Sequence, residues 1–250
     1  MSHEPDRLAP LILYGMGSPN VRKVLIMLEE LGLPYETRHV AVTLGDQFGP
    51  EFQAMNPLGK VPVLTDPNPS QPGAPLFESG AILIYLAETY GGGLLAPSGP
   101  ERYAALCWLM AQMAQVGPML GNNNHFLILP EGTGGYGAGR FADQSMRLYR
   151  KLDERLAASP WLGGEDYSIA DIATWPWAAY LKMHGGDWAD HPHLDNWSRS
   201  IRARPAVQRA DAQYRRFQAL DQEARARATP EQIDQFFGRA PPPQVSGARG

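Results

Sequence analysis

The chain has 250 residues, of which 44% are hydrophobic and 19% charged, with a formal net charge of −4 and an isoelectric point near 5.9. This composition indicates a globular protein long enough for one large domain or two ordinary ones. The mild negative charge excludes an electrostatic basis for binding nucleic acid or an anionic membrane. No run approaches the roughly 18 apolar residues that span a bilayer.

The N-terminal residues and the cysteine content indicate the compartment. Residues 1–10 are polar and of mixed charge, without the apolar core of a signal peptide. The single cysteine, Cys107, excludes an internal disulfide and a Cys-x-x-Cys redox pair. We therefore expect a cytoplasmic protein with no nucleic-acid or membrane partner.

Strand and helix patterns alternate in the first third of the chain. Ser18 and Pro19 are typical of an N-cap and a first helical residue, and Gly32 is placed to end that helix. A strand–helix–strand unit of this kind is expected to be parallel and right-handed. The expected strands cover residues 11–14, 34–42, 61–65 and 75–77, and an apolar helix covers residues 79–89.

After a glycine- and proline-rich linker at residues 91–100, every periodic pattern is helical. Expected features are a helix over residues 102–116 that Gly117-Pro118 breaks, a non-periodic stretch at 122–125, a helix over 140–158 and a capping box at Ser168 and Asp171. The proline, glycine, serine and arginine content near the C-terminus indicates a disordered tail. The predicted divisions are an extension (1–8), an α/β domain (9–90), a linker (91–100), an all-helical domain (101–222) and a tail (223–250).

The stretch Asn56–Leu64 contains an unusual proline. Pro62 stands inside an apolar strand pattern, where proline removes a backbone donor and is normally confined to strand starts, edges and bulges. A cis Val61–Pro62 bond would leave the Val61 N–H and C=O free to pair with an extended, peptide-like ligand. An ordinary strand-starting proline explains the same residues.

Three motifs, in this order and spacing, resemble those of cytosolic glutathione transferases. They are NPLGKVPVL at 56–64, FESGAIL at 77–83 and YSIADI at 167–172, and the resemblance extends over about residues 10–215. Three shorter segments resemble the bacterial nu class: SPN at 18–20, GDQF at 45–48 and QVGPMLGNNNHF at 115–126. The resemblance implies a thioredoxin-like α/β domain (βαβ-ββα), an all-α C-terminal domain and a homodimer.

The resemblance also implies how glutathione would be held. Val61, before a cis Pro62, would pair with the cysteinyl amide, while Glu78 and Ser79 would take the γ-glutamyl ammonium and carboxylate. Without the family motif, Ser79 would be interpreted as a simple N-cap. Lys60 and Gln47 would meet the glycyl end, although Lys60 alone is equally typical of a solvated turn. Arg140, otherwise a surface arginine, would lie near a second glutathione.

The glutathione thiol needs activation, because only the thiolate is a competent nucleophile and a free thiol has a pKa near ~8.5. The start of the Pro19 helix supplies a positive dipole end, and Ser18 and Asn20 can donate hydrogen bonds to sulfur. The nu class usually has threonine where this chain has Ser18, so a serine-type mechanism that uses Ser18 alone also stays open. Met16, Asn124 and His125 are the candidates for contact with the second substrate.

Cys107 lies among apolar neighbours, and we expect it to be buried and to take no part in covalent chemistry. The pair His191 and His193 has no cysteine partner or evident ligand set, so no metal is expected. The leading hypothesis is glutathione-dependent reduction of a small-molecule disulfide. The alternatives are glutathione transfer to an electrophile or thioether cleavage, and a non-catalytic relative that binds glutathione or a protein.

Overall fold

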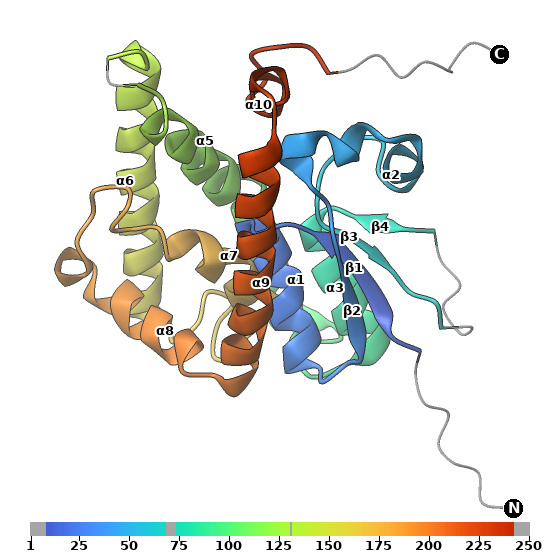
Figure 1. Cartoon of the computed structure of the whole chain (residues 1–250). Coiled ribbons are helices and arrows are strands. Elements are labelled where there is room, and N and C mark those ends of the chain that lie inside the picture. The colour runs from blue at the N-terminus through green and yellow to red at the C-terminus, as the bar shows by residue number, and fades with distance from the viewer. Residues whose placement is uncertain (1–8, 69–73, 131, 243–250) are drawn as a thin grey trace, which may run out of the picture. The chain divides into compact units, whose positions relative to one another are not determined.

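The computed structural model describes residues 9–68, 74–130 and 132–242 (Figure 1). The chain divides into two compact units, one of residues 1–82 and 209–250 and the other of residues 83–208. The C-terminal segment therefore clusters with the N-terminal α/β part rather than with the helices before it. This differs from the sequence prediction, which kept all residues from 101 to 222 in one helical domain.

The first unit is built on a four-stranded sheet in the order β2-β1-β3-β4. β1 and β2 are parallel, as predicted, and β3 is antiparallel to both β1 and β4. The elements of this unit are β1 (Leu11–Gly15), α1 (Pro19–Glu30), β2 (Tyr35–His39), the short helices η1 (Val42–Leu44) and η2 (Asp46–Phe48), α2 (Pro50–Met55), β3 (Val63–Thr65), β4 (Leu76–Phe77) and the start of α3 (Ser79–Tyr90). This is the predicted thioredoxin-like βαβ-ββα order.

The two faces of the sheet are covered differently. Leu11, Leu13 and Leu64 share one face and are fully buried, as are the apolar residues of α1. On the other face, Phe52 of α2 packs in a cluster with Val63 and neighbouring apolar side chains. Alternation along the strands thus places one fully apolar face under α1, while α2 covers the second.

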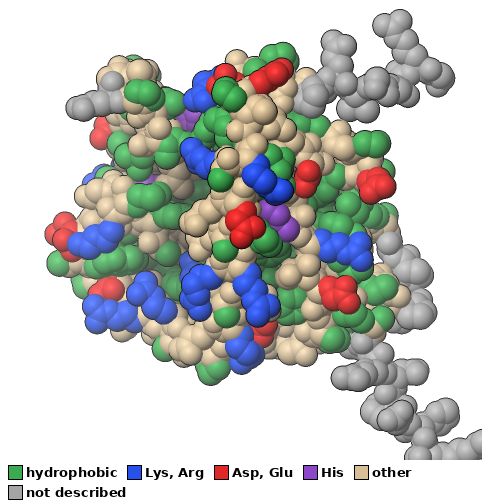
Figure 2. Space-filling model, viewed as in Figure 1, with side chains coloured by type: hydrophobic (Ala, Val, Ile, Leu, Met, Phe, Trp, Pro, Cys, Tyr) green, Lys and Arg blue, Asp and Glu red, His purple; other side chains and the backbone are tan. Residues whose placement is uncertain are grey.

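Two helices follow residue 204 and belong largely to the first unit: α9 (Pro205–Arg227) and α10 (Pro230–Phe236). Ion pairs join α9 to α1, between Arg22 and Asp211 (2.7 Å) and between Arg209 and Glu29 (2.6 Å). Figure 2 shows basic side chains along the outward side of α9. The helix therefore turns one polar face to solvent and a second, ion-pairing face to the sheet domain.

The prediction of disorder from Thr229 on is wrong for the part that the structure describes, because α10 forms there. Thr229 and Gln232 form a capping box that starts α10, and the Gln232 Nε2 also donates to the Leu44 carbonyl at 3.0 Å. The proline-rich composition hid this helix, because Pro230 is a favourable first helical residue rather than a breaker there. Residues 1–8 and 243–250, predicted as extension and final tail, lie outside the described residues.

The second unit is all-helical, as predicted. Its elements are α4 (Gly99–Ala111), the π turn η3 (Gln112–Val116), α5 (Gly117–Leu127), α6 (Gly135–Ala158), α7 (Ile169–Ala178), η4 (Trp188–Asp190) and α8 (Pro192–Arg202). Gly117-Pro118 does not break the helix, and residues 122–125 are helical, so both expectations are wrong. The π turn ends just before Pro118, which falls in the first turn of α5, where a missing N–H is tolerated.

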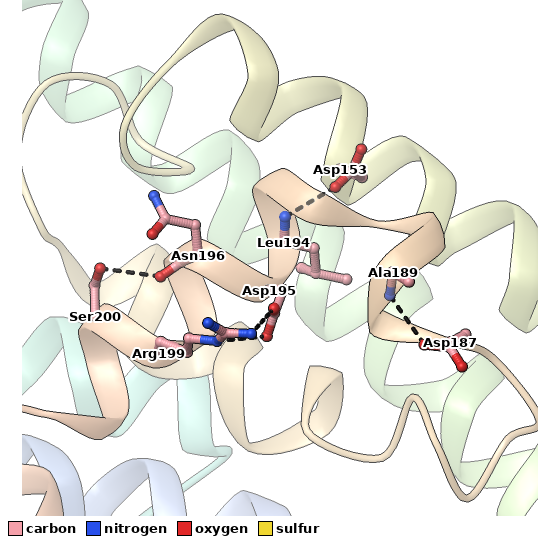
Figure 3. Close-up of polar contacts among 8 residues, drawn as sticks. All are labelled: Asp153, Asp187, Ala189, Leu194, Asp195, Asn196, Arg199 and Ser200. Carbon is pink, nitrogen blue, oxygen red and sulfur yellow. Dashed lines mark hydrogen bonds and ion pairs between the residues drawn. The ribbon is translucent and has the colours of Figure 1, made fainter.

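Aspartate side chains accept from backbone N–H groups at the starts of η4 and α8 (Figure 3). Asp153 of α6 accepts a hydrogen bond from the Leu194 N–H at 2.9 Å, and Asp187 accepts one from the Ala189 N–H at 2.9 Å. Within α8, Arg199 pairs with Asp195 one turn earlier. The Asp153 and Asp187 contacts satisfy N–H groups that helix starts leave unpaired.

The predicted capping box of α7 is confirmed. The Asp171 carboxylate, which is fully buried, accepts bonds from the Ser168 N–H, the Leu162 N–H and the Trp197 Nε1 at 2.9–3.0 Å. Burial raises the pKa of Asp171, and these donors oppose that rise. Asp171 therefore joins three segments of the second unit. None of the described helices is long and apolar enough to cross a membrane.

Candidate glutathione site

A cavity of about 280 Å³ in the first unit brings together most of the predicted site residues of that unit. Met16, Ser18, Asn20, Gln47, Lys60 and Val61 all line it. Gln235 and Phe236 of α10 also line it, which the sequence did not predict. A larger cavity of about 490 Å³ near Tyr14 and Arg38 contains none of these predicted residues.

The helix start at one end of the cavity suits a thiolate. Ser18 caps α1, because its Oγ accepts a hydrogen bond from the Val21 N–H at 3.4 Å, and Pro19 occupies the first helical position. The first turn has no acidic side chain of its own, so the N–H groups at the positive end of the helix dipole can favour an anion in the cavity. The Ser18 hydroxyl proton can then be donated to a sulfur in the cavity, with Asn20 beside it.

The Asn56 side chain shapes the turn that carries Leu58, Gly59, Lys60 and Val61, which line the cavity. Its Oδ1 accepts from the Leu58 N–H at 3.0 Å, and its Nδ2 donates to the Lys60 carbonyl at 2.7 Å. The following Val61–Pro62 bond is cis, which settles the question that the sequence left open. Among the described residues, the Val61 backbone forms no hydrogen bond, so its N–H and C=O are available to a ligand.

Gln47 supplies a further acceptor. Its side chain is only 4% exposed, and its Oε1 is buried without a hydrogen-bond partner in the described structure. A buried acceptor left unpaired costs about 1–3 kcal/mol, so a ligand donor at this position would relieve that cost. Gln53 holds this loop in place by donating to the Gln47 carbonyl at 2.7 Å. Lys60, which lines the same cavity as Gln47, is exposed to solvent.

Glu78 and Ser79 do not line the cavity. They directly follow Phe77 of β4, which pairs with Val63 of β3. Glu78 is a non-glycine residue with a positive φ of 68°, a conformation that costs about 1–3 kcal/mol and is concentrated at functional sites. Ser79 starts α3 and accepts a hydrogen bond from the buried Lys23 Nζ at 3.2 Å. Burial lowers the pKa of Lys23 to about 7, and the Glu78 charge partly opposes this shift.

The remaining predicted residues, Asn124, His125 and Arg140, belong to the second unit. The Asn124 Oδ1 accepts from the His184 Nε2 at 2.6 Å, and the Tyr149 hydroxyl donates to the His184 Nδ1 at 2.7 Å. Asn124 is thus part of an internal polar network. His125 packs edge-to-face on its neighbour Phe126, with ring centroids 5.8 Å apart.

Arg140 lies on α6 beside a cavity of about 420 Å³ that Asp143 and Arg147 also line. It donates to the hydroxyl of Tyr136 at 3.4 Å, and this pair is exposed. An exposed guanidinium is free to meet a carboxylate from solution, which is compatible with the predicted contact to a second glutathione. That role stays a prediction.

The prediction that Cys107 is buried is wrong, because the residue is exposed. Its apolar neighbours in sequence lie on other faces of α4, whereas Tyr103 and Met110, which share its face at helical spacing, are exposed too. Sequence reasoning also missed Lys23, Gln235 and Phe236. The position of Lys23 within the apolar run of α1 could have indicated that it is buried. No sequence pattern indicated that Gln235 and Phe236 of α10 line the cavity.

Comparisons with known proteins agree with these features. A family model described as "Glutathione S-transferase, N-terminal domain" matches residues 13–94, and one described as "Glutathione S-transferase, C-terminal domain" matches residues 136–200. The disulfide-bond oxidoreductase YfcG of Escherichia coli is 45% identical over 200 residues, which cover 79% of this chain and 93% of that protein.

Two solved structures are also similar. A glutathione transferase family member from Pseudomonas fluorescens, with two glutathione molecules bound, has a TM-score of 0.74 and 40% identity, covering 80% of this chain and 91% of its own. A glutathione transferase from Pseudomonas putida, with one glutathione disulfide bound per subunit, has a TM-score of 0.74 and 38% identity, covering 84% and 92%.

Proposed function

Since the chain belongs to the glutathione transferase family, we propose that it is a glutathione-dependent disulfide oxidoreductase. The observation that carries the proposal is the cavity that places the α1 start, the unpaired Val61 backbone and the buried Gln47 acceptor around one space. These groups match a thiol, a peptide backbone and an amide N–H, which glutathione has in that combination.

In the proposed complex, the glutathione thiolate lies at Ser18 and Asn20, and the cysteinyl amide pairs with Val61 next to Pro62. The glycyl end meets Gln47 and Lys60. The γ-glutamyl end meets Glu78 and Ser79. Gln47, whose amide oxygen is buried and unpaired, has the most direct structural support among the binding residues.

The proposed reaction uses two glutathione molecules per disulfide. The bound thiolate attacks one sulfur of the substrate, the substrate S–S bond breaks, a mixed disulfide forms, and the leaving thiolate takes a proton. A second glutathione thiolate then attacks the glutathione sulfur of the mixed disulfide. Glutathione disulfide and a second thiol result, so two glutathiones are oxidised and one disulfide is reduced.

Disulfide chemistry is favoured over conjugation by two comparisons. YfcG is named for disulfide-bond oxidoreduction, and the Pseudomonas structures hold two glutathiones or one glutathione disulfide. A site for a second glutathione is what the proposed second step needs. We assign Arg140 to the carboxylate of that second molecule, and Met16, Asn124 and His125 to contacts with the second substrate.

The proposal includes a homodimer in the cytoplasm. Tyr103, Cys107 and Met110 form an exposed, mainly apolar stripe on α4, which a partner subunit could cover. A cytoplasmic location suits a reaction that consumes reduced glutathione, because that compartment keeps thiols reduced. Light scattering of the purified protein tests the dimer, and a monomer over the working concentration range would contradict it.

The experiment that tests the function compares two steady-state assays with glutathione in common, one with a small aliphatic disulfide and one with an aryl halide. The proposal predicts rapid disulfide reduction and feeble conjugation. Rapid conjugation with little disulfide reduction would instead support a serine-type transferase. Glutathione binding without turnover in either assay would support a specialised thioether substrate or a binding protein.

A further inference from the structure

Both backbone groups of Gly17 are held by side chains of α9, more than 190 residues away in sequence. The Gly17 N–H donates to the Asp221 Oδ2 at 2.7 Å. The Tyr214 hydroxyl donates to the Gly17 carbonyl at 3.3 Å. Gly17 directly precedes Ser18, so these two contacts hold the two successive peptide units, 16–17 and 17–18, that lead into the proposed thiol-binding helix.

Asp221 is itself anchored on the sheet. Its Oδ1 lies 2.8 Å from the Nε2 of His39, at the end of β2, and both side chains are about four-fifths buried. The His39 ring in turn packs against Phe217 of α9, with ring centroids 6.2 Å apart. A single carboxylate thus joins the turn after β1 to the end of β2.

The close approach of α9 to the turn depends on glycine. A Cβ at residue 17 would lie 2.7 Å from the Asp221 Oδ2 and 2.7 Å from the Cγ of Gln218. The Cβ would also lie 3.0 Å from the Gln218 Cα, so a side chain at residue 17 would have to displace the Asp221 carboxylate and crowd the backbone of α9. The chain therefore brings a helix from its C-terminal part into direct contact with the backbone of the site.

We propose that Asp221 is a positioning residue for thiolate stabilisation, with Tyr214 in support. The proposal rests on the function proposed above. Ser18 stabilises a thiolate through its hydroxyl and through the N–H groups of the helix that it caps, and both depend on where the turn lies. Asp221 and Tyr214 hold that turn from outside the cavity, since neither side chain lines it.

The test measures the thiol pKa of bound glutathione, from the ultraviolet absorbance of the thiolate, together with kcat and KM for disulfide reduction. In the full-length protein, Asp221→Ala should raise this pKa by about one unit and lower kcat/KM on the order of 10- to 100-fold, because small displacements of reacting groups are costly. Asp221→Asn keeps an acceptor for the Gly17 N–H and should change both the thiol pKa and kcat/KM less than Asp221→Ala does.

Asp211→Ala is the matched control. It breaks the other buried contact of a carboxylate on α9, with Arg22, but does not touch Gly17. The control should leave the thiol pKa unchanged even if it lowers stability. An unchanged pKa in Asp221→Ala, or an equal shift in Asp211→Ala, would overturn the proposal.

If Asp221→Ala does not fold, Tyr214→Phe tests the proposal in its place, because it removes only the donor to the Gly17 carbonyl. It should shift the thiol pKa upward by less than Asp221→Ala would, and no shift would overturn the proposal. Failure of the proposed function has a different signature. The natural protein would then bind glutathione without reducing disulfides, while the pKa comparison among the variants would still decide the role of Asp221.

Discussion

The Nζ of Lys23 lies 3.2 Å from the Oγ of Ser79, and neither residue is more than 3% exposed. A lysine is rarely buried to this degree without a charged partner. Glu78, the residue before Ser79, provides the nearby negative charge. The pair places a potential cation directly under the proposed γ-glutamyl subsite, where it would favour a bound carboxylate.

Lys23→Met should therefore weaken glutathione binding while it stabilises the protein. Burial disfavours the charged form of Lys23, which is why its pKa is lowered, and an apolar side chain of similar size removes that desolvation cost. Isothermal titration with glutathione and urea unfolding at pH 7 measure the two effects. A variant that binds glutathione as tightly as the natural protein would contradict a role for Lys23 at the site.

The same lysine predicts a pH dependence of stability. Its pKa of about 7 in the folded protein is below its ordinary value of 10.5. Between these values the unfolded state binds more protons, so the Lys23 contribution raises the free energy of unfolding as the pH rises from 7 to 10.5. The stabilisation by Lys23→Met should thus be largest at or below pH 7 and shrink toward pH 10.5.

Asn20→Ala tests the thiolate site. A hydrogen bond to a charged group contributes about 1.5–3 kcal/mol, which corresponds to a thiol pKa of bound glutathione raised by roughly 1–2 units. Ser18→Ala should have a comparable effect if both residues donate to the sulfur. A pKa that rises only in Ser18→Ala would support the serine-type mechanism, and an unchanged pKa in Asn20→Ala would remove that residue from its role.

Phe236→Ala tests the part played by α10. Phe236 lines the glutathione cavity, and its loss should raise the Kd for glutathione by about 5- to 30-fold, since burial of part of a phenylalanine contributes about 1–2 kcal/mol. Asp234→Ala is the control, because Asp234 of α10 pairs with Arg239 and does not line the cavity. Equal losses in the two variants would mean that α10 acts only through its own folding.

The network around His184 predicts sensitivity to acid. Burial lowers the pKa of His184 to about 4, from an ordinary value of 6.5. The unfolded state binds more protons in this window, so the free energy of unfolding should fall as the pH drops from 6.5 to 4.

Tyr149→Phe removes the donor to the His184 Nδ1 and should lower the free energy of unfolding by about 1–3 kcal/mol, measured by urea unfolding at pH 7. A cost below measurement error would show that the network contributes nothing.

Local patterns were sufficient for much of this fold. The Ser18 cap, the Ser168 and Asp171 capping box and the order of strands and helices along the first domain depend on residues close in sequence, and the sequence predicted all three. The cis bond before Pro62 became an expectation only with the family motif, because the nine residues around it permit two conformations. Cys107 was misplaced because its immediate neighbours, rather than residues three and four positions away, were taken as its surroundings.

Local sequence patterns could not predict that α9 and α10 contribute to the glutathione site. The contacts of Asp221 with Gly17 and His39 join residues 204 and 182 positions apart. No periodicity or capping signal encodes a pairing over that distance. The composition from Thr229 on suggested disorder, yet α10 is stabilised by its capping box and by the contact of Gln232 with Leu44.

The most direct test of the central claim is a competition in which the protein, glutathione, a small disulfide and an aryl halide react together, and the products are identified by mass spectrometry. The account predicts one glutathione disulfide for each disulfide reduced, two free thiols, and little S-aryl glutathione, with this pattern lost in Asn20→Ala. S-aryl glutathione as the main product, with the disulfide left intact, would contradict it.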